Sequence, residues 1–289
     1  MIRRLCIIGV GLIGGSAALA ARERGLCDEI VGVDRDQGNL AKALGLGVID
    51  CGSAVVEEAA VGADFVLIAV PVGSIAGVFK SLKPVWSADT VYTDVGSTKS
   101  SVVDALRQCL GKMPANFVPG HPIAGAERSG VVASTSNLYT GKRVILTPGP
   151  DCDAGCLQAV TSFWSSLGAK VALMEPEHHD AVLAATSHLP HVLAYTLVHL
   201  LGRKDEQEEI FQYAAGGFRD FTRIASSDPT MWLDICFANE AHVLPLIDEF
   251  RAELDVFAGS LRARNAEDVY QFLATAREAR QRFLVRMEN

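Results

Sequence analysis

The sequence has 289 residues, of which 49% are hydrophobic and 21% are charged, a composition typical of globular proteins that excludes an intrinsically disordered chain. This length exceeds the usual size of one domain, so we expect two domains. The formal net charge of −8 argues against a general nucleic-acid-binding protein, which needs a basic surface.

The first part of the chain alternates short apolar runs with helical segments. Such runs are typical of strands that are buried on both faces of a parallel sheet. We expect strands at residues 5–8, 30–33, 65–70, 91–93, 117–118 and 143–146. Alternating strands and helices imply right-handed crossovers and a parallel sheet that binds ligands at the carboxyl ends of its strands.

A glycine-rich turn connects the first predicted strand to the first helix. Gly9 permits the tight turn, Gly11 lets the main chain approach a pyrophosphate, and Gly14 allows close packing of helix on strand. The helix N-terminus would also attract phosphate groups. The motif in this context predicts a Rossmann-type dinucleotide-binding domain, with the candidate cofactor-binding residues Gly9, Gly11, Leu12, Ile13, Gly14, Asp34, Arg35, Val70 and Ser97.

An acidic residue, Asp34, ends the second predicted strand, 20 residues after Gly14. A carboxylate at this position can accept hydrogen bonds from the adenosine ribose hydroxyls. It would also repel the 2′-phosphate of NADP, so we predict NAD as the cofactor. The neighbouring Arg35 could pair with that phosphate, and NADP therefore remains the alternative.

Residues 1–21 superficially resemble a signal peptide, because two arginines precede an uncharged run. Glycines and a serine interrupt this run, and the dinucleotide motif explains their spacing better. The seven cysteines are scattered without a Cys-x-x-Cys pair, as in free thiols of a reducing compartment. We expect a cytoplasmic protein without a membrane partner.

Beyond about Val171 the pattern changes from strands to helices. Residues 177–201 are helical in pattern, with a kink or break at Pro190. Apolar residues at steps of three and four predict one long helix over 243–261, and a terminal helix follows over 267–287. The charge changes too: residues 1–171 contain 15 basic and 15 acidic side chains, and residues 172–289 contain 11 and 19. We predict a Rossmann-type domain over 1–171 and an all-helical domain over 172–289.

Two polar motifs follow predicted strands at the expected ligand-binding edge of the sheet. One is the segment Asp94–Lys99, and the other is Gly120–Gly130, in which His121 stands between a glycine and a proline. A histidine with an unperturbed pKa near 6.5 can accept a proton at neutral pH. His121 is therefore a candidate catalytic base, and a structural histidine that holds the loop is the alternative.

The helical part contains three histidines, His179, His188 and His191, that invite a metal-site interpretation. Pro190 disrupts a simple helical pair, and no acidic fourth ligand stands at a familiar spacing, so we predict no metal.

The segment Gly216–Trp232 contains two arginines, Arg219 and Arg223. A guanidinium can bind a carboxylate through two parallel hydrogen bonds, although a surface ion pair is the alternative for each. Together the motifs predict a nicotinamide-dependent oxidoreductase that acts on a small carboxylic acid.

The sequence resembles the prephenate/arogenate (cyclohexadienyl) dehydrogenase family. The matching stretches, in family order, are Gly9–Gly14, Asp94–Lys99, Gly120–Gly130, Ser187–His191 and Gly216–Trp232. The resemblance implies oxidative decarboxylation of prephenate to 4-hydroxyphenylpyruvate in tyrosine biosynthesis, or of arogenate to tyrosine, with NAD(P). It also implies a homodimer in which the helical domains pack together.

The resemblance assigns roles to individual residues. His121 matches the catalytic histidine, which removes the proton of the ring C4 hydroxyl, and Ser97 matches a serine that helps to orient this histidine and the substrate. Arg223 matches an arginine that binds a substrate carboxylate. The remaining positions that it places around the substrate pocket are His191, His188, His179, Gly216 and Trp232.

Two other classes of function are alternatives to this one. β-Hydroxyacid dehydrogenases share the fold plan but typically use a lysine base on the helical domain, where this chain offers histidines. A non-catalytic NAD-binding protein would not require Ser97, His121, His191 and Arg223 together. No residue is an obvious counter-charge for the ammonium group of arogenate, so prephenate is the predicted substrate and dual use the alternative.

Overall fold

The computed structural model describes residues 1–125, 128–204 and 209–288. Residues 126 and 127 of the predicted His121 loop thus lie outside the described residues. The chain divides into two compact units, Met1–Glu240 and Ala241–Asn289, which are described separately. Helices beyond residue 171 pack on the first part of the chain through the contacts of α7 with α5 and of α11 with α4. The functional boundary between residues 171 and 172 stays a prediction.

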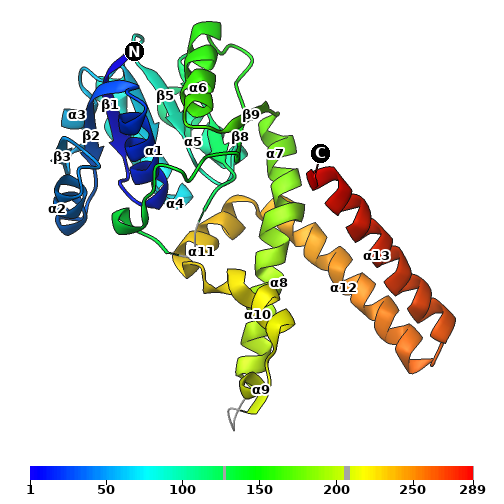
Figure 1. Ribbon diagram of the computed structural model, residues 1–289. Helices are drawn as coiled ribbons and strands as arrows, with labels where there is room; N and C mark the ends of the chain where they lie inside the picture. Colours follow the sequence, from blue (N-terminus) through cyan, green and yellow to red (C-terminus); the bar gives the residue numbers. More distant parts are fainter. Residues whose placement is uncertain (126–127, 205–208, 289) are drawn as a thin grey trace. The chain divides into compact units, whose positions relative to one another are not determined.

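A six-stranded parallel sheet lies at the centre of the first unit (Figure 1). Its order is β3-β2-β1-β4-β5-β6, with bounds β1 (Ile2–Ile8), β2 (Cys27–Val33), β3 (Cys51–Ser53), β4 (Phe65–Ile68), β5 (Val91–Asp94) and β6 (Phe117–Val118). The predicted parallel sheet is confirmed, although β3 was not predicted and β4 ends before Val70. The strand order reverses between β1 and β4, which opens a crevice at the carboxyl ends of these strands.

Helices cover both faces of this sheet and form two hydrophobic cores. Leu5 and Ile7 of β1 pack in one core with α1 and α6, whereas Cys6 and Ile8 pack in the other with α4 and α5. Both faces are buried, which explains why the strands read as continuous apolar runs. The helices are α1 (Leu12–Glu23), α2 (Gln37–Gly45), α3 (Val56–Ala60), α4 (Val72–Leu82), α5 (Ser100–Leu110) and α6 (Ala154–Ser166), with short 3-10 turns at Lys83–Val85 and Val131–Ala133.

A second, three-stranded sheet contains β7 (Gly120–Pro122), β8 (Arg143–Leu146) and β9 (Lys170–Leu173). β7 is antiparallel to β8, and β8 is parallel to β9. The strand predicted at 143–146 exists but belongs to this sheet rather than to the main one. Pro119 lies between β6 and β7 and lacks the N–H that a further ladder bond would need. The chain leaves the main sheet at that point and carries His121 into the second.

The helical part of the first unit begins with a nearly continuous run (Figure 1), made of α7 (Pro176–Leu183), a π-helical segment (Ala184–His188) and α8 (Leu189–Gly202). Pro190 lies in the first turn of α8, directly after the π-helical segment, and its missing N–H removes one main-chain hydrogen bond from the run. The predicted kink or break is thus a π-helical adjustment inside the run, a feature frequent at functional sites. The other helices are α9 (Glu209–Gln212), α10 (Gly216–Thr222), a 3-10 turn (Arg223–Ser226) and α11 (Pro229–Ala238).

Within the described residues, the run Pro176–Gly202 is the one helix long and apolar enough to span a membrane by length and composition. The expectation of a protein without a membrane partner stays a prediction. Averaged hydropathy is weak evidence here, since a helix that packs on other helices passes the same test. Its buried polar residues His179, Asp180 and His188 bond to other parts of the first unit.

The second unit is an antiparallel pair of helices, α12 (Glu240–Arg262) and α13 (Ala266–Glu288) (Figure 1). The rings of Phe257 and Phe272 pack across the pair with their centroids 5.1 Å apart. Both long helices were predicted within a few residues of these bounds. Large apolar side chains remain exposed along them, including Leu254, Leu261, Leu273 and Phe283.

Candidate active site

A cavity of about 560 Å³ opens beside the glycine-rich turn. It is lined by five of the predicted cofactor-binding residues: Gly9, Gly11, Asp34, Arg35 and Val70. The other four, Leu12, Ile13, Gly14 and Ser97, are not among its lining residues. The cavity lies where the strand order reverses, as expected for a dinucleotide site.

A different feature of the local geometry favours glycine at each of the three positions of the turn. Gly9 has a positive φ of 97°, and a Cβ there would lie 2.4 Å from the carbonyl oxygen of Ala69. A Cβ at Gly14 would lie 2.1 Å from the carbonyl oxygen of Gly9, so α1 packs against the turn. Gly11 has open space around its Cβ position and lines the cavity. This open space beside the N-terminus of α1 fits a pyrophosphate group.

The Asp34 carboxylate is held in place at the cavity wall. Its Oδ2 accepts a hydrogen bond of 2.7 Å from Asn39 Nδ2, and its Oδ1 accepts one of 3.0 Å from the Asp36 amide. The Asn39 side chain is itself fixed through the Val10 carbonyl. A fixed acceptor of this kind fits the two hydroxyls of an adenosine ribose. Asn39 was missed because its role depends on the turn of α2.

Replacing Asp34 by asparagine is expected to raise the ratio of kcat/KM for NADP to that for NAD by about tenfold or more. The physical reason is the removal of a like charge opposite the 2′-phosphate, a juxtaposition that costs several kcal/mol. Steady-state kinetics with both cofactors measure this ratio. The control is Asp28→Asn, an exposed residue near the other end of β2. An unchanged ratio in Asp34→Asn would contradict the assignment.

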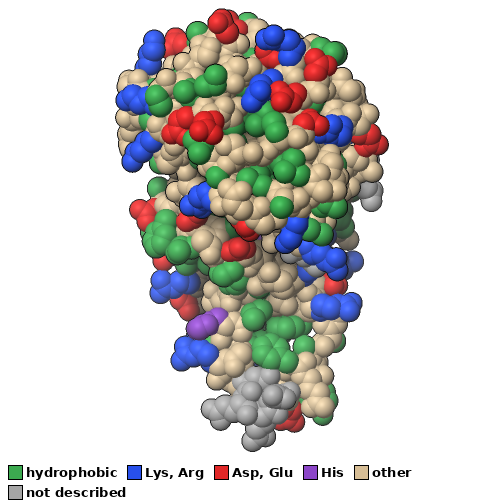
Figure 2. Space-filling view, turned by 90° about the vertical axis from the view of Figure 1, so that its left-hand side faces the viewer, with side chains coloured by type: hydrophobic (Ala, Val, Ile, Leu, Met, Phe, Trp, Pro, Cys, Tyr) green, Lys and Arg blue, Asp and Glu red, His purple; other side chains and the backbone are tan. Residues whose placement is uncertain are grey.

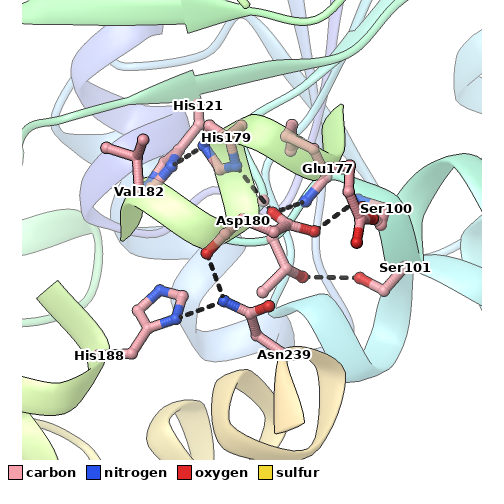
Figure 3. Close-up of polar contacts among 12 residues, drawn as sticks. Ser100, Ser101, His121, Glu177, His179, Asp180, Val182, His188 and Asn239 are labelled. Carbon is pink, nitrogen blue, oxygen red and sulfur yellow. Dashed lines mark hydrogen bonds and ion pairs between the residues drawn. The ribbon is translucent and has the colours of Figure 1, made fainter. Parts of the chain in front are cut away.

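The candidate base, His121, extends from β7 toward α7 (Figure 3). Its Nδ1 lies 2.9 Å from Nε2 of His179, and Nδ1 of His179 lies 2.8 Å from Oδ1 of Asp180. Burial of the His121 ring, with further contributions from His179, Lys99 and His188, holds its pKa well below the ordinary value. His121 is therefore a neutral imidazole at physiological pH, which is the form that accepts a proton.

A buried ion pair fixes the main chain at Gly120, next to the candidate base His121. Lys99 and Asp94 are fully buried and hydrogen-bonded to each other. Lys99 Nζ also donates to the Gly120 carbonyl at 2.7 Å, and the Gly120 amide donates to Asp94 Oδ1 at 3.1 Å. Burial lowers the pKa of Lys99, and the attraction of Asp94 opposes this. Asp94 and Lys99 are the first and last residues of a motif identified from the sequence. Their contact with Gly120 could not be inferred from spacing.

His188 supports this site from the π-helical segment. The side-chain amide of Asn239 donates to the Asp180 carbonyl at 2.9 Å and to Nδ1 of His188 at 3.0 Å. His188 is 1% exposed, and burial lowers its pKa to about 4. The hydrogen bond from Asn239 also requires the neutral ring nitrogen. Asn239 and Asp180 were missed because neither stands in a recognisable motif.

His188 is expected to make folding stability depend on pH. Its pKa is about 4 in the folded protein and near 6.5 when unfolded, so the unfolded chain binds this proton first as the pH falls. The contribution of His188 to the free energy of unfolding is complete above about pH 6.5 and is lost as the pH falls toward 4. The expected loss between about pH 7 and pH 5 is about 2 kcal/mol.

Denaturant unfolding of wild type and His188→Asn at pH 7 and pH 5 measures how much of this loss of stability comes from His188. Asparagine retains an acceptor for Asn239 but has no titrating group. The variant should lose less stability than wild type by about 2 kcal/mol. Equal losses in the two proteins would rule out His188 as the source.

A second cluster joins three further predicted residues. The rings of His191 and Trp232 are stacked, with centroids 3.7 Å apart, and Nδ1 of His191 donates to the Ser187 carbonyl. Burial lowers the pKa of His191, and the nearby charge of Arg223 contributes to this shift. Arg223 begins the 3-10 turn and is exposed to solvent. The ring centroids of His188 and Trp232 are 6.0 Å apart, so the two clusters adjoin.

Two predicted residues are not joined to these clusters. Ser97 is half-buried, and within the described chain no hydrogen bond links its hydroxyl to His121, whose ring contacts His179 instead. Gly216 begins α10 and is exposed. Their roles stay predictions. The described residues also contain no group of three or more His, Cys, Asp or Glu side chains placed to hold a metal ion.

Two family models match the chain and together span most of it. The model described as prephenate dehydrogenase, nucleotide-binding domain, matches residues 17–173. The model described as prephenate dehydrogenase, dimerization domain, matches residues 175–275.

Curated proteins and solved structures resemble the chain over nearly its full length. A cyclohexadienyl dehydrogenase from Zymomonas mobilis is 35% identical over 96% of this chain and 95% of its own. A prephenate dehydrogenase from Bacillus subtilis is 36% identical over 96% of this chain and 75% of its own. The crystal structure of prephenate dehydrogenase from Aquifex aeolicus in complex with hydroxyphenyl propionate and NAD+ has a TM-score of 0.90 and 38% identity, covering 98% of this chain and 99% of that one.

Proposed function

The chain belongs to the prephenate dehydrogenase family, and from this premise we propose that it converts prephenate to 4-hydroxyphenylpyruvate by NAD-dependent oxidative decarboxylation. The observation that carries the proposal is the His121 ring, hydrogen-bonded to His179 in the same unit as the cavity that Gly9, Gly11 and Asp34 line. A hydroxyl oxidation needs a base for the hydroxyl proton and an acceptor for the hydride, and this unit provides a place for both.

Residues around the cavity would hold the cofactor. Gly9 and Gly11 provide the close main-chain approach for its pyrophosphate, and Asp34 provides the acceptor for its ribose hydroxyls. When bound, NAD supplies the acceptor for the hydride that leaves C4 of the substrate.

The substrate side of the reaction rests on His121 and Arg223. His121 accepts the proton of the C4 hydroxyl, so that the oxygen becomes a ketone as the hydride departs. Loss of CO₂ from C1 then leaves its bonding electron pair in the ring, which becomes aromatic as a phenolate, and the imidazolium of His121 returns the proton to the phenolate oxygen. Aromatisation makes the overall reaction strongly downhill. The protein has only to hold C4 in position and keep the substrate anion oriented. Arg223 is the proposed anion contact, beside His191 and Trp232.

Incubating the protein with prephenate and NAD tests the proposal. We expect the absorbance of reduced nicotinamide to rise together with release of CO₂ and formation of 4-hydroxyphenylpyruvate, which chromatography identifies. Reduced nicotinamide without CO₂ release would indicate a simple hydroxyacid dehydrogenase. Binding of NAD with no turnover would support a non-catalytic protein instead.

Arogenate is a second candidate substrate, favoured by the similarity to a cyclohexadienyl dehydrogenase. Prephenate and arogenate differ in the side chain, which carries a keto group in one and an amino group in the other. Comparing kcat/KM for the two substrates with each nicotinamide cofactor distinguishes a specific enzyme from a dual one. Comparable values for both would make this a cyclohexadienyl dehydrogenase.

The chain carries a dimerization domain, and we propose a homodimer formed by the helical part, with residues 1–171 binding the dinucleotide and residues 172–289 binding substrate and partner. Figure 2 shows hydrophobic side chains gathered at the end of the first unit that holds α8–α10, and the exposed large ones there include Leu200, Phe211 and Phe221. Exposed apolar surface of this kind is typical of interfaces. We propose no nucleic-acid or membrane partner, given the acidic charge.

We propose a cytoplasmic location. All seven cysteines are free thiols, which fits a reducing compartment.

A further inference from the structure

Three side chains, Asp180, His179 and the candidate base His121, form a hydrogen-bonded line (Figure 3). Asp180 and His179, on α7, are 1% and 0% exposed. His179 Nδ1 lies 2.8 Å from Asp180 Oδ1, and His179 Nε2 lies 2.9 Å from His121 Nδ1. Asp180 is also fixed at the N-terminus of α5, where it accepts hydrogen bonds of 2.8 Å from the amides of Lys99 and Ser100.

The ionisation of Asp180 decides where the protons on this line are. Burial alone would raise its pKa, but the hydrogen bonds from His179 and from the two amides outweigh burial and lower the pKa. Asp180 is therefore a carboxylate, which can only accept hydrogen bonds. The hydrogen bond to this carboxylate therefore places a proton on Nδ1 of His179, and a His179 ring with a single proton has that proton there. Its Nε2 carries a lone pair.

The same reasoning extends one residue further. A lone pair on His179 Nε2 requires that His121 donates from Nδ1. In a neutral imidazole only one nitrogen carries a proton, so Nε2 of His121 is unprotonated. We propose that Asp180, acting through His179, holds His121 in the Nδ1–H tautomer, so that Nε2 is the atom that accepts the substrate hydroxyl proton.

This inference rests on the proposed function for its chemical meaning. In that reaction the O–H bond of the C4 hydroxyl breaks and an N–H bond forms at Nε2, which gives an imidazolium. The electron pair of the O–H bond becomes the second bond of the ketone, while the hydride passes from C4 to NAD. His179 and Asp180 do not touch the reacting atoms and are positioning residues.

The groups around His121 explain why such a partner is needed. Burial of the ring and the Lys99 ammonium, from the loop before α5, act against a positive charge on His121. Asp94 neutralises Lys99, and Asp180 is the carboxylate behind His179. A hydrogen bond from the imidazolium Nδ1–H to His179, backed by Asp180, stabilises the charge that appears during proton transfer.

Two substitutions of His179 separate its two hydrogen bonds. In His179→Asn the amide nitrogen takes the place of Nδ1 and can donate to Asp180, but nothing reaches His121. In His179→Gln the side-chain oxygen takes the place of Nε2 and can accept from His121. Asp180→Asn is a poorer test because it also disturbs the hydrogen bonds at the start of α5. The matched control is His178→Asn, the exposed neighbour on the same helix.

We expect His179→Asn to lower kcat about 10- to 100-fold, because part of the general-base contribution is lost with the tautomer. His179→Gln should retain more activity than His179→Asn, and His178→Asn should match wild type. The acid limb of the pH profile of kcat/KM should shift in His179→Asn but not in the control. Thermal unfolding and the Kd for NAD should change little in any variant, which separates this role from a structural one.

Imidazole nitrogen chemical shifts measure the tautomer directly in ¹⁵N-histidine-labelled protein. We expect a protonated Nδ1 and an unprotonated Nε2 for His121 at neutral pH, assigned by comparison with His121→Asn. A protonated Nε2, or wild-type kcat and pH profile in His179→Asn, would overturn the proposal. This measurement needs no substrate, so the tautomer can be confirmed or refuted even if the protein does not oxidise prephenate.

Discussion

Replacing His121 by asparagine is expected to lower kcat by about 10²–10⁴-fold, the usual contribution of a general base. The asparagine amide nitrogen can stand where Nδ1 stands and still donate to His179, so the hydrogen-bonded line survives. What the variant lacks is Nε2 and the proton affinity of the ring. Rapid-mixing measurement of nicotinamide reduction under saturating substrate reports the chemical step.

The Kd for NAD should stay near the wild-type value in this variant, because His121 does not line the cofactor cavity. The pH profile supplies a second criterion. His121 has a lowered pKa, so wild-type activity should persist as the pH falls below 6.5 and decline only at more acidic pH. A variant with undiminished kcat and the same acid limb would remove His121 from the role of base.

Replacing Arg223 by alanine is expected to raise KM for prephenate about 10- to 100-fold with a smaller effect on kcat. A hydrogen bond to a charged partner is worth about 1.5–3 kcal/mol, and every 1.4 kcal/mol is tenfold in affinity. This is a lower value than for a fully buried pair, because Arg223 is exposed in the single chain. Steady-state kinetics with varied prephenate at saturating NAD measure the effect.

Arg203→Ala is a matched control for this substitution. Arg203 is an exposed arginine at the C-terminal end of α8, the helix whose first turn carries His191. His191 and Arg203 are about 18 Å apart along the axis of this helix. The control should keep the wild-type KM. If Arg223→Ala binds prephenate as tightly as Arg203→Ala does, the anion contact lies elsewhere.

The parts of the fold that could be predicted are those with a local physical signal. The strand before Gly9, the helix after it and the acid at Asp34 form a pattern of short range, and the structure places Gly9, Gly11 and Asp34 at one cavity. The two long helices of the second unit were visible as apolar stripes for the same reason. His121 was identified because a histidine between glycine and proline has no ordinary place in a helix.

The surroundings of His121 could not be predicted, because they depend on contacts between distant segments. His121 and His179 are 58 residues apart in the chain, and nothing in either motif indicates that their rings meet. Asp180 and Asn239 carry no motif of their own. The change of sheet at Pro119 also required the tertiary structure, since the run at 143–146 reads equally well as a strand of either sheet.

The buried ion pair of Lys99 and Asp94 has a consequence for how this site can evolve. Losing one partner leaves the other as an uncompensated interior charge, at a cost of about 3–5 kcal/mol, and it releases one of the two bonds that hold Gly120. Neither position can therefore drift alone without loss of folded protein. Lineages that vary here are expected to have exchanged both residues together, so the pair is inherited as one unit.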